Sequence, residues 1–318
     1  MYKLSNIFQV IAIVGPTASG KSALADALAL DFKTKVISAD AMQVYRFMDI
    51  GTAKTPLAER KVELLGIDLV NPDEQFSASN YQMLVRPEVD KLNEEGLPAI
   101  LCGGSGLYVD ALIDDMHFPQ GEQLENLIRE KYERYASEHG AQALHALLSE
   151  KDPKSAKLIH PHNSRRVIRA LEMLEDGISY AEQSEKLHEH KAYYSSIIFG
   201  LNMQRDILYE RINQRVDTMF DMGLVEEVRM LLDQGFLQAA TAKQAIGYKE
   251  IVQAFAGEIS LDEARDKIKQ ASRRYAKRQL TWFRRDPRII WLDSLEQSLK
   301  EQIECIKVKI QKECDYRS

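Results

Sequence analysis

Residues 10–22 read VIAIVGPTASGKS, and this stretch decides the fold of the 318-residue chain. Its first five residues are an apolar run of the kind that forms a buried strand. The next eight match G-x-x-x-x-G-K-[ST], and a helix-like segment rich in Ala and Leu runs on to Asp31. A strand, a glycine-rich turn and a helix in this order are the setting of a phosphate-binding loop, or P-loop.

The P-loop predicts a site for a di- or triphosphate. Its glycines let the backbone curl so that successive N–H groups point inward, and the following helix adds the positive end of its dipole. We expect the Lys21 amine to neutralise the outer phosphate oxygens and the Ser22 hydroxyl to ligate a bridging Mg²⁺ ion. The predicted phosphate-binding residues are Gly15, Pro16, Thr17, Ala18, Ser19, Gly20, Lys21 and Ser22. The motif alone leaves nucleotide kinases, ATPases and diphosphate-dependent transferases open.

The alternation of apolar runs and helix-like segments predicts an α/β fold. Strand-like runs at residues 36–38 and 98–102 flank a helical segment near residues 81–95. This is the pattern of parallel βαβ units. A further run at residues 289–292 is expected to be the last strand of the core. The predicted core is therefore a parallel sheet of the P-loop NTPase type.

Strand-like runs are missing from the middle of the sequence. They stop at about Gly121 and return near Ser195, so we expect residues 121–191 to form an all-helical insert. Residues 1–120 and 192–318 then make up the core with its C-terminal helices. The last helical stretch, residues 295–312, carries the mixed charge of a solvated amphipathic face and is given no chemistry.

Composition favours a soluble protein of a reducing compartment. No run of eighteen apolar residues is available to span a bilayer, which argues against a membrane partner. The three cysteines have no metal-ligand spacing and leave an odd count, so neither a zinc site nor a disulfide framework is predicted. The expectation is a cytoplasmic protein, and a monomer.

Positive charge is concentrated in two stretches on an acidic background. The formal net charge is −6, yet residues 265–288 hold ten Lys or Arg against two acids, and residues 153–171 hold five against none. The position of positive charge matters more for phosphate binding than the net charge of the chain. The sequence therefore does not exclude a nucleic-acid partner.

Asp40 follows the apolar run at residues 36–38. A carboxylate there is expected at the carboxyl end of a parallel strand, where the ligand sites of α/β proteins lie. It can accept a proton from an acceptor nucleophile, lie in the outer shell of a Mg²⁺ ion, or cap a helix that begins at Ala41. The spacing of the motif leaves these roles open.

The run at residues 98–102 is followed by Gly-Gly-Ser-Gly at positions 103–106. A typical P-loop ATPase has an acid after this strand to hold Mg²⁺, so the sequence disfavours an ATPase. The segment predicts another tight strand-to-helix turn at the same edge of the sheet. Ser105 is either close enough to contact an acceptor or part of the turn only.

Seven motifs together resemble those of the bacterial-type tRNA dimethylallyltransferases, also called tRNA isopentenyltransferases. They are GPTASGKS at 15–22, ISADAMQVY at 37–45, MDIGTAK at 48–54, GGSGLY at 103–108, NSRRVIRALE at 163–172, KQAIGYKE at 243–250 and KRQLTWFR at 277–284. The resemblance covers nearly the whole chain. It departs from many relatives where Ala41 follows the acid in place of Ser.

The resemblance implies transfer of a dimethylallyl group from its diphosphate to the exocyclic amine of adenosine 37 of tRNA, with Mg²⁺ as cofactor. In that scheme the P-loop holds the diphosphate, its Thr17 is also a catalytic residue, and Asp40 is the general base. Gln43 helps to hold the flipped base. Arg211 and Arg215 resemble family arginines that offset charge on the leaving diphosphate, although a solvated helix face explains them as well.

Contacts to the anticodon stem-loop of tRNA are predicted for the two basic stretches and for the motif residues near Asp40. Clustered arginines suit RNA phosphates, and the aromatic rings among them suit stacked bases. The predicted tRNA-binding residues are Asp40, Ala41, Met42, Gln43, Ser105, Arg165, Arg166, Val167, Ile168, Arg169, Lys243, Gln244, Ala245, Ile246, Gly247, Tyr248, Lys277, Arg278, Gln279, Leu280, Thr281, Trp282, Phe283 and Arg284.

Three alternative functions remain at this point. An adenylate isopentenyltransferase uses the same donor on a free nucleotide and does not need the arginines of the insert. A nucleotide kinase with Asp40 as base and a nucleotide-gated RNA-binding switch are the others. Analysis of the prenylated product separates all of them from a tRNA-modifying enzyme.

Overall fold

A computed structural model describes residues 8–118, 127–187, 189–239, 241–294 and 297–317. The chain divides into two compact units, a core unit of residues 1–114 and 192–318 and a helical unit of residues 115–191. The predicted boundary at Gly121 and the predicted start of the last helix at residue 295 lie outside the described residues. No helix in the described part of the chain has the length and apolar character needed to cross a membrane.

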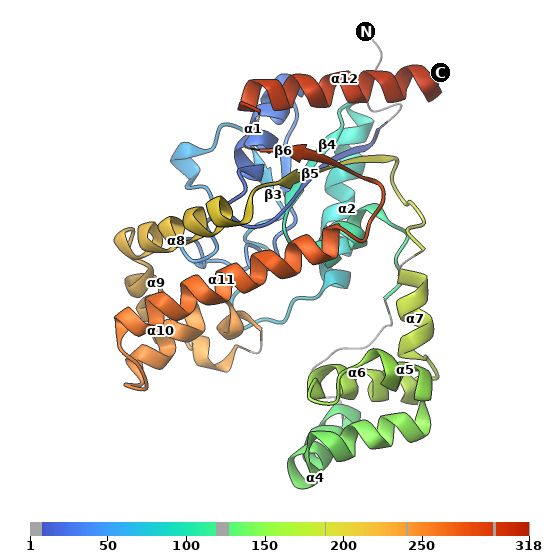
Figure 1. Cartoon of the computed structure of the whole chain (residues 1–318), viewed down its shortest axis with the longest axis vertical. Helices are drawn as coiled ribbons and strands as arrows, with labels where there is room; N and C mark the ends of the chain where they lie inside the picture. Colours follow the sequence, from blue (N-terminus) through green and yellow to red (C-terminus); the bar gives the residue numbers. More distant parts are fainter. Residues whose placement is uncertain (1–7, 119–126, 188, 240, 295–296, 318) are drawn as a thin grey trace. The chain divides into compact units, whose positions relative to one another are not determined.

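The core unit is built on one six-stranded parallel sheet (Figure 1). The strands are β1 (Val10–Val14), β2 (Val36–Ser38), β3 (Leu64–Leu65), β4 (Ala99–Gly103), β5 (Ser196–Asn202) and β6 (Ile289–Asp293). Their order across the sheet is β3-β2-β4-β1-β5-β6. This confirms the predicted α/β class and parallel sheet. Strand β3 was not predicted, because two residues are too short for a periodic signal.

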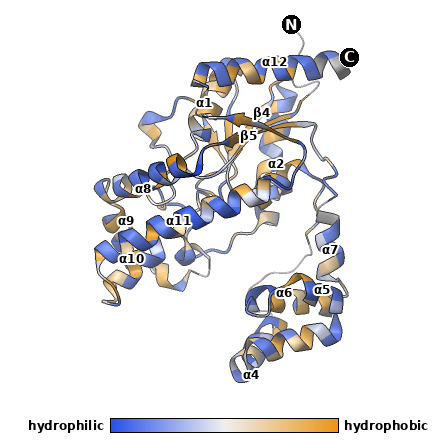
Figure 2. Cartoon of the chain, in the orientation of Figure 1, coloured by the Kyte–Doolittle hydropathy of each residue, from blue (hydrophilic) through white to orange (hydrophobic). Residues whose placement is uncertain are grey.

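The helices of the core unit connect the parallel strands and cover the sheet, as parallel sheets require. They are α1 (Lys21–Phe32), α2 (Ala78–Glu94), α3 (Gly106–Ile113), α8 (Arg205–Asp221), α9 (Leu224–Asp233), α10 (Tyr248–Phe255), α11 (Leu261–Phe283) and α12 (Leu299–Arg317). Figure 2 shows the hydrophobic strands β4 and β5 and the mixed character of α8 and α11.

Helix α12 is more than a solvated tail. Its residues Ile306 and Ile310 are 0% and 2% exposed and belong to the hydrophobic cluster that contains Leu24 and Leu28 of α1. Lys307 on the same helix forms an ion pair of 2.5 Å with Asp31 of α1. The prediction of a solvated face is correct only for the outer side of α12, because the inner side completes the core behind the P-loop helix.

The helical unit has a hydrophobic core of its own. It contains α4 (Leu127–Lys151), α5 (Pro153–Leu158), α6 (Ser164–Glu175) and α7 (Tyr180–Leu187). The backbone of Gly140 interrupts α4, with a φ of 84° that side-chain-bearing residues rarely adopt. Val167 and Ile168 of α6 are 0% and 6% exposed within this core. The prediction that their side chains contact tRNA is therefore wrong, because they pack the interior of the unit.

Candidate active site

A cavity of about 550 Å³ opens at the carboxyl ends of β1, β2 and β4. Its lining comes mainly from the P-loop, the segment after β2, helix α8, the residues before α10 and helix α11, with further residues from α1 and from strands β2, β3 and β4. This is the edge of a parallel sheet at which α/β proteins bind their ligands. Lys21 and Asp40 both line the cavity, so the structure brings the predicted phosphate loop and the predicted base to one site.

The P-loop has the backbone conformation that its glycines predict. Gly15 and Gly20 have φ values of 152° and 92°, and a residue with a side chain rarely adopts either value. The Lys21 amine donates to the carbonyl of Pro16 at 3.2 Å, and burial lowers the pKa of this amine. The buried Ser19 hydroxyl has no hydrogen-bond partner within the described residues. A phosphate in the loop would provide one.

Asp40 is half-buried and lines the cavity together with two cationic side chains, Lys21 and Arg215. Its Oδ1 accepts the N–H of Met42 at 2.9 Å, in a turn rather than at the start of a helix. The helix-cap interpretation of Asp40 is therefore wrong. The charge of Asp40 favours the protonated forms of Lys21 and Arg215, whose pKa values burial lowers. The carboxylate and the two cations thus share one desolvated site.

Arg215 and Arg211 differ in position, although one helical turn separates them on α8. Arg215 lines the cavity beside Ile212 and Val216, whereas Arg211 is exposed and is not among the lining residues. The prediction of a charge-offsetting arginine is supported by the position of Arg215 alone. For Arg211 the structure favours the solvated helix face.

Ser105 and Tyr275 stand beside Asp40. The Ser105 Oγ accepts the N–H of Ala41 at 2.9 Å. Burial raises the pKa of Tyr275 to about 12, and the charge of Asp40 acts in the same direction. Tyr275 lines the cavity but was predicted only as one aromatic residue of the basic stretch. Its helical spacing gave no sign that it faces the acid.

Gln279 links the P-loop to the turn after β4. Its Oε1 accepts the N–H of Thr17 at 2.9 Å, and its Nε2 donates to the Gly104 carbonyl at 2.9 Å. A Cβ on Gly104 would lie 2.1 Å from this Nε2, so glycine is required for the close approach. The side chain is 4% exposed. A tRNA contact was predicted for Gln279, but its amide is engaged by the protein.

The other motif residues of α11 and of the segment before α10 divide between the cavity, the core and the surface. Lys277, Arg278, Thr281 and Arg284 are exposed, and Arg278 also lines the cavity. Phe283 is 2% exposed and cannot stack on a base. The half-buried Trp282 donates to Asp110 at 3.0 Å, and Leu280 packs on a small apolar cluster. In the segment that leads into α10, the residues that line the cavity are Gln244, Ala245, Ile246, Gly247 and Tyr248. The amine of Lys243 donates to the carbonyl of Leu237 at 3.0 Å.

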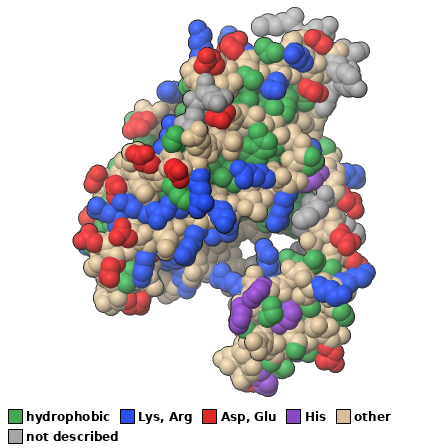
Figure 3. All heavy atoms as spheres, viewed as in Figure 1, with side chains coloured by type: hydrophobic (Ala, Val, Ile, Leu, Met, Phe, Trp, Pro, Cys, Tyr) green, Lys and Arg blue, Asp and Glu red, His purple; other side chains and the backbone are tan. Residues whose placement is uncertain are grey.

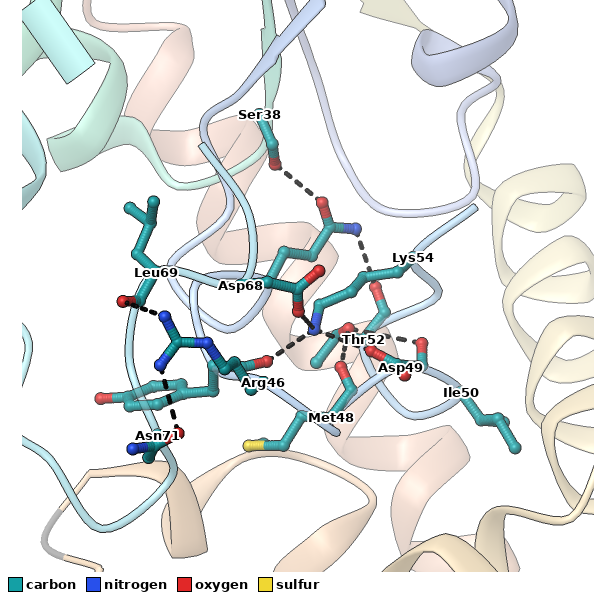
Figure 4. Close-up of polar contacts among 12 residues, drawn as sticks. Ser38, Arg46, Met48, Asp49, Ile50, Thr52, Lys54, Asp68, Leu69 and Asn71 are labelled. Atoms are coloured by element: carbon teal, nitrogen blue, oxygen red, sulfur yellow. Dashed lines mark hydrogen bonds and ion pairs between the residues drawn. The ribbon is translucent and has the colours of Figure 1, made fainter. Parts of the chain in front are cut away.

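The segment after β2 forms what we call the acceptor wall, the cavity-lining residues Ser38, Gln43, Gly51, Thr52 and Ala53. The Ser38 hydroxyl donates to Gln43 Oε1 at 2.7 Å, and Gln43 Nε2 donates to the Thr52 carbonyl at 3.1 Å (Figure 4). The wall is therefore a network of hydrogen bonds within one segment of chain.

Lys54 secures the base of the acceptor wall (Figure 4). Its amine is buried and donates to the carbonyl of Tyr45, to Asp49 at 2.8 Å and to Asp68 at 2.6 Å. A buried cation needs such partners to offset the loss of hydration. The MDIGTAK motif is thus a structural element next to the cavity.

Comparison with known proteins agrees with this geometry. The sequence profile described as IPP transferase matches residues 43–286. The chain belongs to the IPP transferase family. This confirms the family resemblance predicted from the seven motifs. The IPP transferase profile covers the acceptor wall from Gln43 onward, the helical unit and α11, and it ends at Asp286.

Individual relatives match most of the length of the chain. The tRNA dimethylallyltransferase of Carboxydothermus hydrogenoformans is 46% identical over 300 residues, which cover 94% of this chain and 96% of the relative. The crystal structure of the full-length tRNA isopentenylpyrophosphate transferase from Bacillus halodurans is 41% identical, covers 97% and 98% of the two chains, and has a TM-score of 0.70. A eukaryotic dimethylallyltransferase, described as acting on tRNA, is 26% identical over 90% of this chain and 73% of its own, with a TM-score of 0.73.

Proposed function

We propose that this protein transfers a dimethylallyl group from dimethylallyl diphosphate to the N6 amine of adenosine 37 of tRNA. The observation that carries the proposal is that Asp40 and the P-loop amine of Lys21 line one cavity. The names of the relatives support the same reaction. Such a reaction needs one site that binds a diphosphate and accepts a proton from a nucleophile, and this cavity offers both groups.

The P-loop side of the cavity acts on the leaving group. Cleavage of the allylic C–O bond leaves positive charge on the prenyl carbon and negative charge on the diphosphate. Preorganised N–H donors and cations stabilise the second charge. The Lys21 amine and Arg215 line the cavity, and the buried Ser19 hydroxyl of the P-loop has no partner in the described residues.

The oxygen donors present also fit a Mg²⁺ ion, which prefers hydroxyl, carboxylate and phosphate oxygens. The Ser22 hydroxyl and the carboxylate of Asp26, one turn further along α1, both line the cavity. Bound there, the ion would neutralise diphosphate oxygens. The remaining steps are carried by the side chains of the protein.

The acceptor side of the cavity prepares the nucleophile. The exocyclic amine of adenine is weakly nucleophilic because its lone pair is delocalised into the ring. As the N–C bond forms and the C–O bond breaks, the amine loses a proton, and the Asp40 carboxylate is placed to accept it. The base must leave its stack to reach this site. Gln43 and Tyr275 line the space in which it would lie.

Binding of the anticodon stem-loop is assigned to exposed basic side chains of both units. On α6 of the helical unit these are Arg165 and Arg166, while Arg169 is partly occupied by an ion pair of 3.6 Å with Glu172. On the core unit, Lys and Arg side chains gather over α8 and α11 (Figure 3). The proposal includes action in the cytoplasm as a monomer.

Product analysis tests this function. The protein is incubated with unmodified tRNA, dimethylallyl diphosphate and Mg²⁺, and the digested tRNA is analysed by mass spectrometry. We expect a five-carbon mass increase on the adenosine next to the anticodon. Prenylation of free adenylate but not of tRNA would identify an adenylate isopentenyltransferase instead. A phosphorylated product would identify a kinase.

A further inference from the structure

Glu227 of α9 is a buried carboxylate that lies behind the acceptor wall. It is 8% exposed and is not among the residues that line the cavity. Its Oε2 accepts the N–H groups of Asp49 at 3.0 Å and Ile50 at 2.7 Å. Its Oε1 accepts the N–H of Gly51 at 3.1 Å and the hydroxyl of Tyr248 at 2.6 Å. Four donors from two distant parts of the chain therefore converge on one carboxylate.

The segment held by Glu227 leads directly into the acceptor wall. The two carbonyls that follow Gly51, those of Thr52 and Ala53, accept from Gln43 Nε2 at 3.1 Å and 3.5 Å. A carbonyl can only accept, so it forces Nε2 rather than Oε1 to face it. The Ser38 hydroxyl can donate or accept and does not decide the orientation by itself. The position of the two carbonyls thus fixes which way the Gln43 amide points.

Close packing leaves little room for this segment to shift. A Cβ on Gly51 would lie 2.4 Å from Cε2 of Tyr248, and Tyr248 is 0% exposed. The ring and the backbone of the segment are therefore in direct contact. Movement of the Glu227 carboxylate would move the amides it binds, and with them the carbonyls that orient Gln43.

We propose that Glu227 is a positioning residue for the acceptor base, acting through Gln43. This inference rests on the proposed function. With Nε2 directed at the two carbonyls, Gln43 offers the cavity the remaining lone pair of Oε1, an acceptor. Adenine presents an amine, a donor, where guanine presents a carbonyl. An orientation fixed by Glu227 therefore favours adenine, and loss of the carboxylate weakens use of the tRNA while leaving use of the donor unchanged.

The test begins with Glu227→Gln, which keeps the shape and replaces one acceptor oxygen by an NH₂ group that faces N–H donors. We expect kcat/KM for tRNA to fall roughly tenfold to a hundredfold, as for a lost set of buried hydrogen bonds. KM for dimethylallyl diphosphate should stay within about twofold of the wild-type value. An equally large loss of kcat/KM for dimethylallyl diphosphate would overturn the proposal.

A matched control separates positioning from stability. Thr34→Val removes a buried hydrogen bond of 2.8 Å to the Pro98 carbonyl at the opposite, amino-terminal edge of the sheet. It should lower the melting temperature without changing kcat/KM for tRNA. If Glu227→Gln does not fold, Tyr248→Phe removes one of the four donors more gently. That variant should then show the same selective loss of kcat/KM for tRNA, with KM for dimethylallyl diphosphate unchanged.

A double-mutant cycle decides whether Glu227 acts through Gln43. In a Gln43→Ala background, Glu227→Gln should change kcat/KM for tRNA by less than about twofold, because the group it orients is gone. Additive losses would reduce Glu227 to general structural support and contradict the proposal. Absence of prenylated adenosine with the wild-type protein would contradict the proposed function itself. The two failures are thus distinguishable.

Discussion

The P-loop and the acceptor wall lie on the same cavity but differ in how their polar groups are satisfied. In the P-loop the Ser19 hydroxyl is buried without a partner in the described part of the chain, and the Lys21 amine donates to the loop carbonyl of Pro16. In the acceptor wall the Gln43 amide is held at both ends, by Ser38 and by Thr52. The polar groups of the P-loop are thus incompletely hydrogen-bonded, whereas the Gln43 amide of the acceptor wall is hydrogen-bonded within the protein.

The difference follows from what each wall must bind. A diphosphate carries strong acceptors and a high charge, so it can organise a loop of donors that is otherwise incompletely satisfied. A purine base is neutral and is distinguished only by where its donors and acceptors lie, so the groups that read it must be fixed beforehand. We infer that donor binding completes the P-loop, whereas the acceptor wall is already in place.

The largest effect is expected from a substitution that removes the proton acceptor in the cavity between the two walls. Asp40→Asn removes the proton acceptor but keeps the shape of the side chain. We expect kcat to fall by about 10² to 10⁴, the usual contribution of a general base. Binding of diphosphate, measured by calorimetry, should persist because the P-loop is unchanged. Unaltered turnover would remove Asp40 from its role, and Asp73→Asn in an exposed turn is the control.

A smaller effect is expected from removing basic side chains that bind tRNA but belong to neither wall. Arg165→Ala combined with Arg166→Ala removes two exposed cations of α6. Each lost phosphate contact should reduce the slope of log affinity against log salt by roughly 0.7 to 0.9. Titration of tRNA at several salt concentrations measures this slope. A change in KM for dimethylallyl diphosphate, or a slope equal to that of the wild type, would contradict the assignment.

The fold and half of the site could be predicted because their signals are local. The P-loop requires particular backbone angles at Gly15 and Gly20, and these are written into a short motif. Asp40 could be placed because the carboxyl ends of parallel strands meet at one edge. Arg211 and Arg215 lie one turn apart on the same helix, however, and only the position of the cavity along α8 separates the exposed one from the one that lines it.

The missed contacts join positions that are distant in sequence. Gln279 reaches the Thr17 amide across 262 positions, and Glu227 reaches Gly51 across 176. Periodicity assigns both only to a helix face. The one available signal for these contacts was a glycine at a position where no turn requires one. Gly104 and Gly51 have ordinary backbone angles, but a side chain at either would collide with Gln279 or Tyr248.

Two serines give the smallest and sharpest test of the difference between the walls. Ser38→Ala breaks an existing, partly buried hydrogen bond to Gln43, so it should lower the free energy of unfolding of the free protein by about 1 kcal/mol. Ser19→Ala removes a hydroxyl with no partner in the described structure, so unfolding of the free protein should be unchanged or more difficult. Denaturant titration of both variants measures this difference.

For diphosphate affinity we expect the opposite order, with the larger effect at Ser19 and the smaller at Ser38. Ser19→Ala should weaken diphosphate affinity by roughly three- to tenfold, the effect of one lost hydrogen bond to a charged group in a partly wet site. Ser38→Ala should leave that affinity unchanged and lower kcat/KM for tRNA only a few-fold, because the Thr52 carbonyl still orients Gln43. If both variants lose stability equally and both weaken diphosphate binding, the two walls do not differ as inferred here. Preorganisation would then be a property of the whole cavity rather than of its acceptor side.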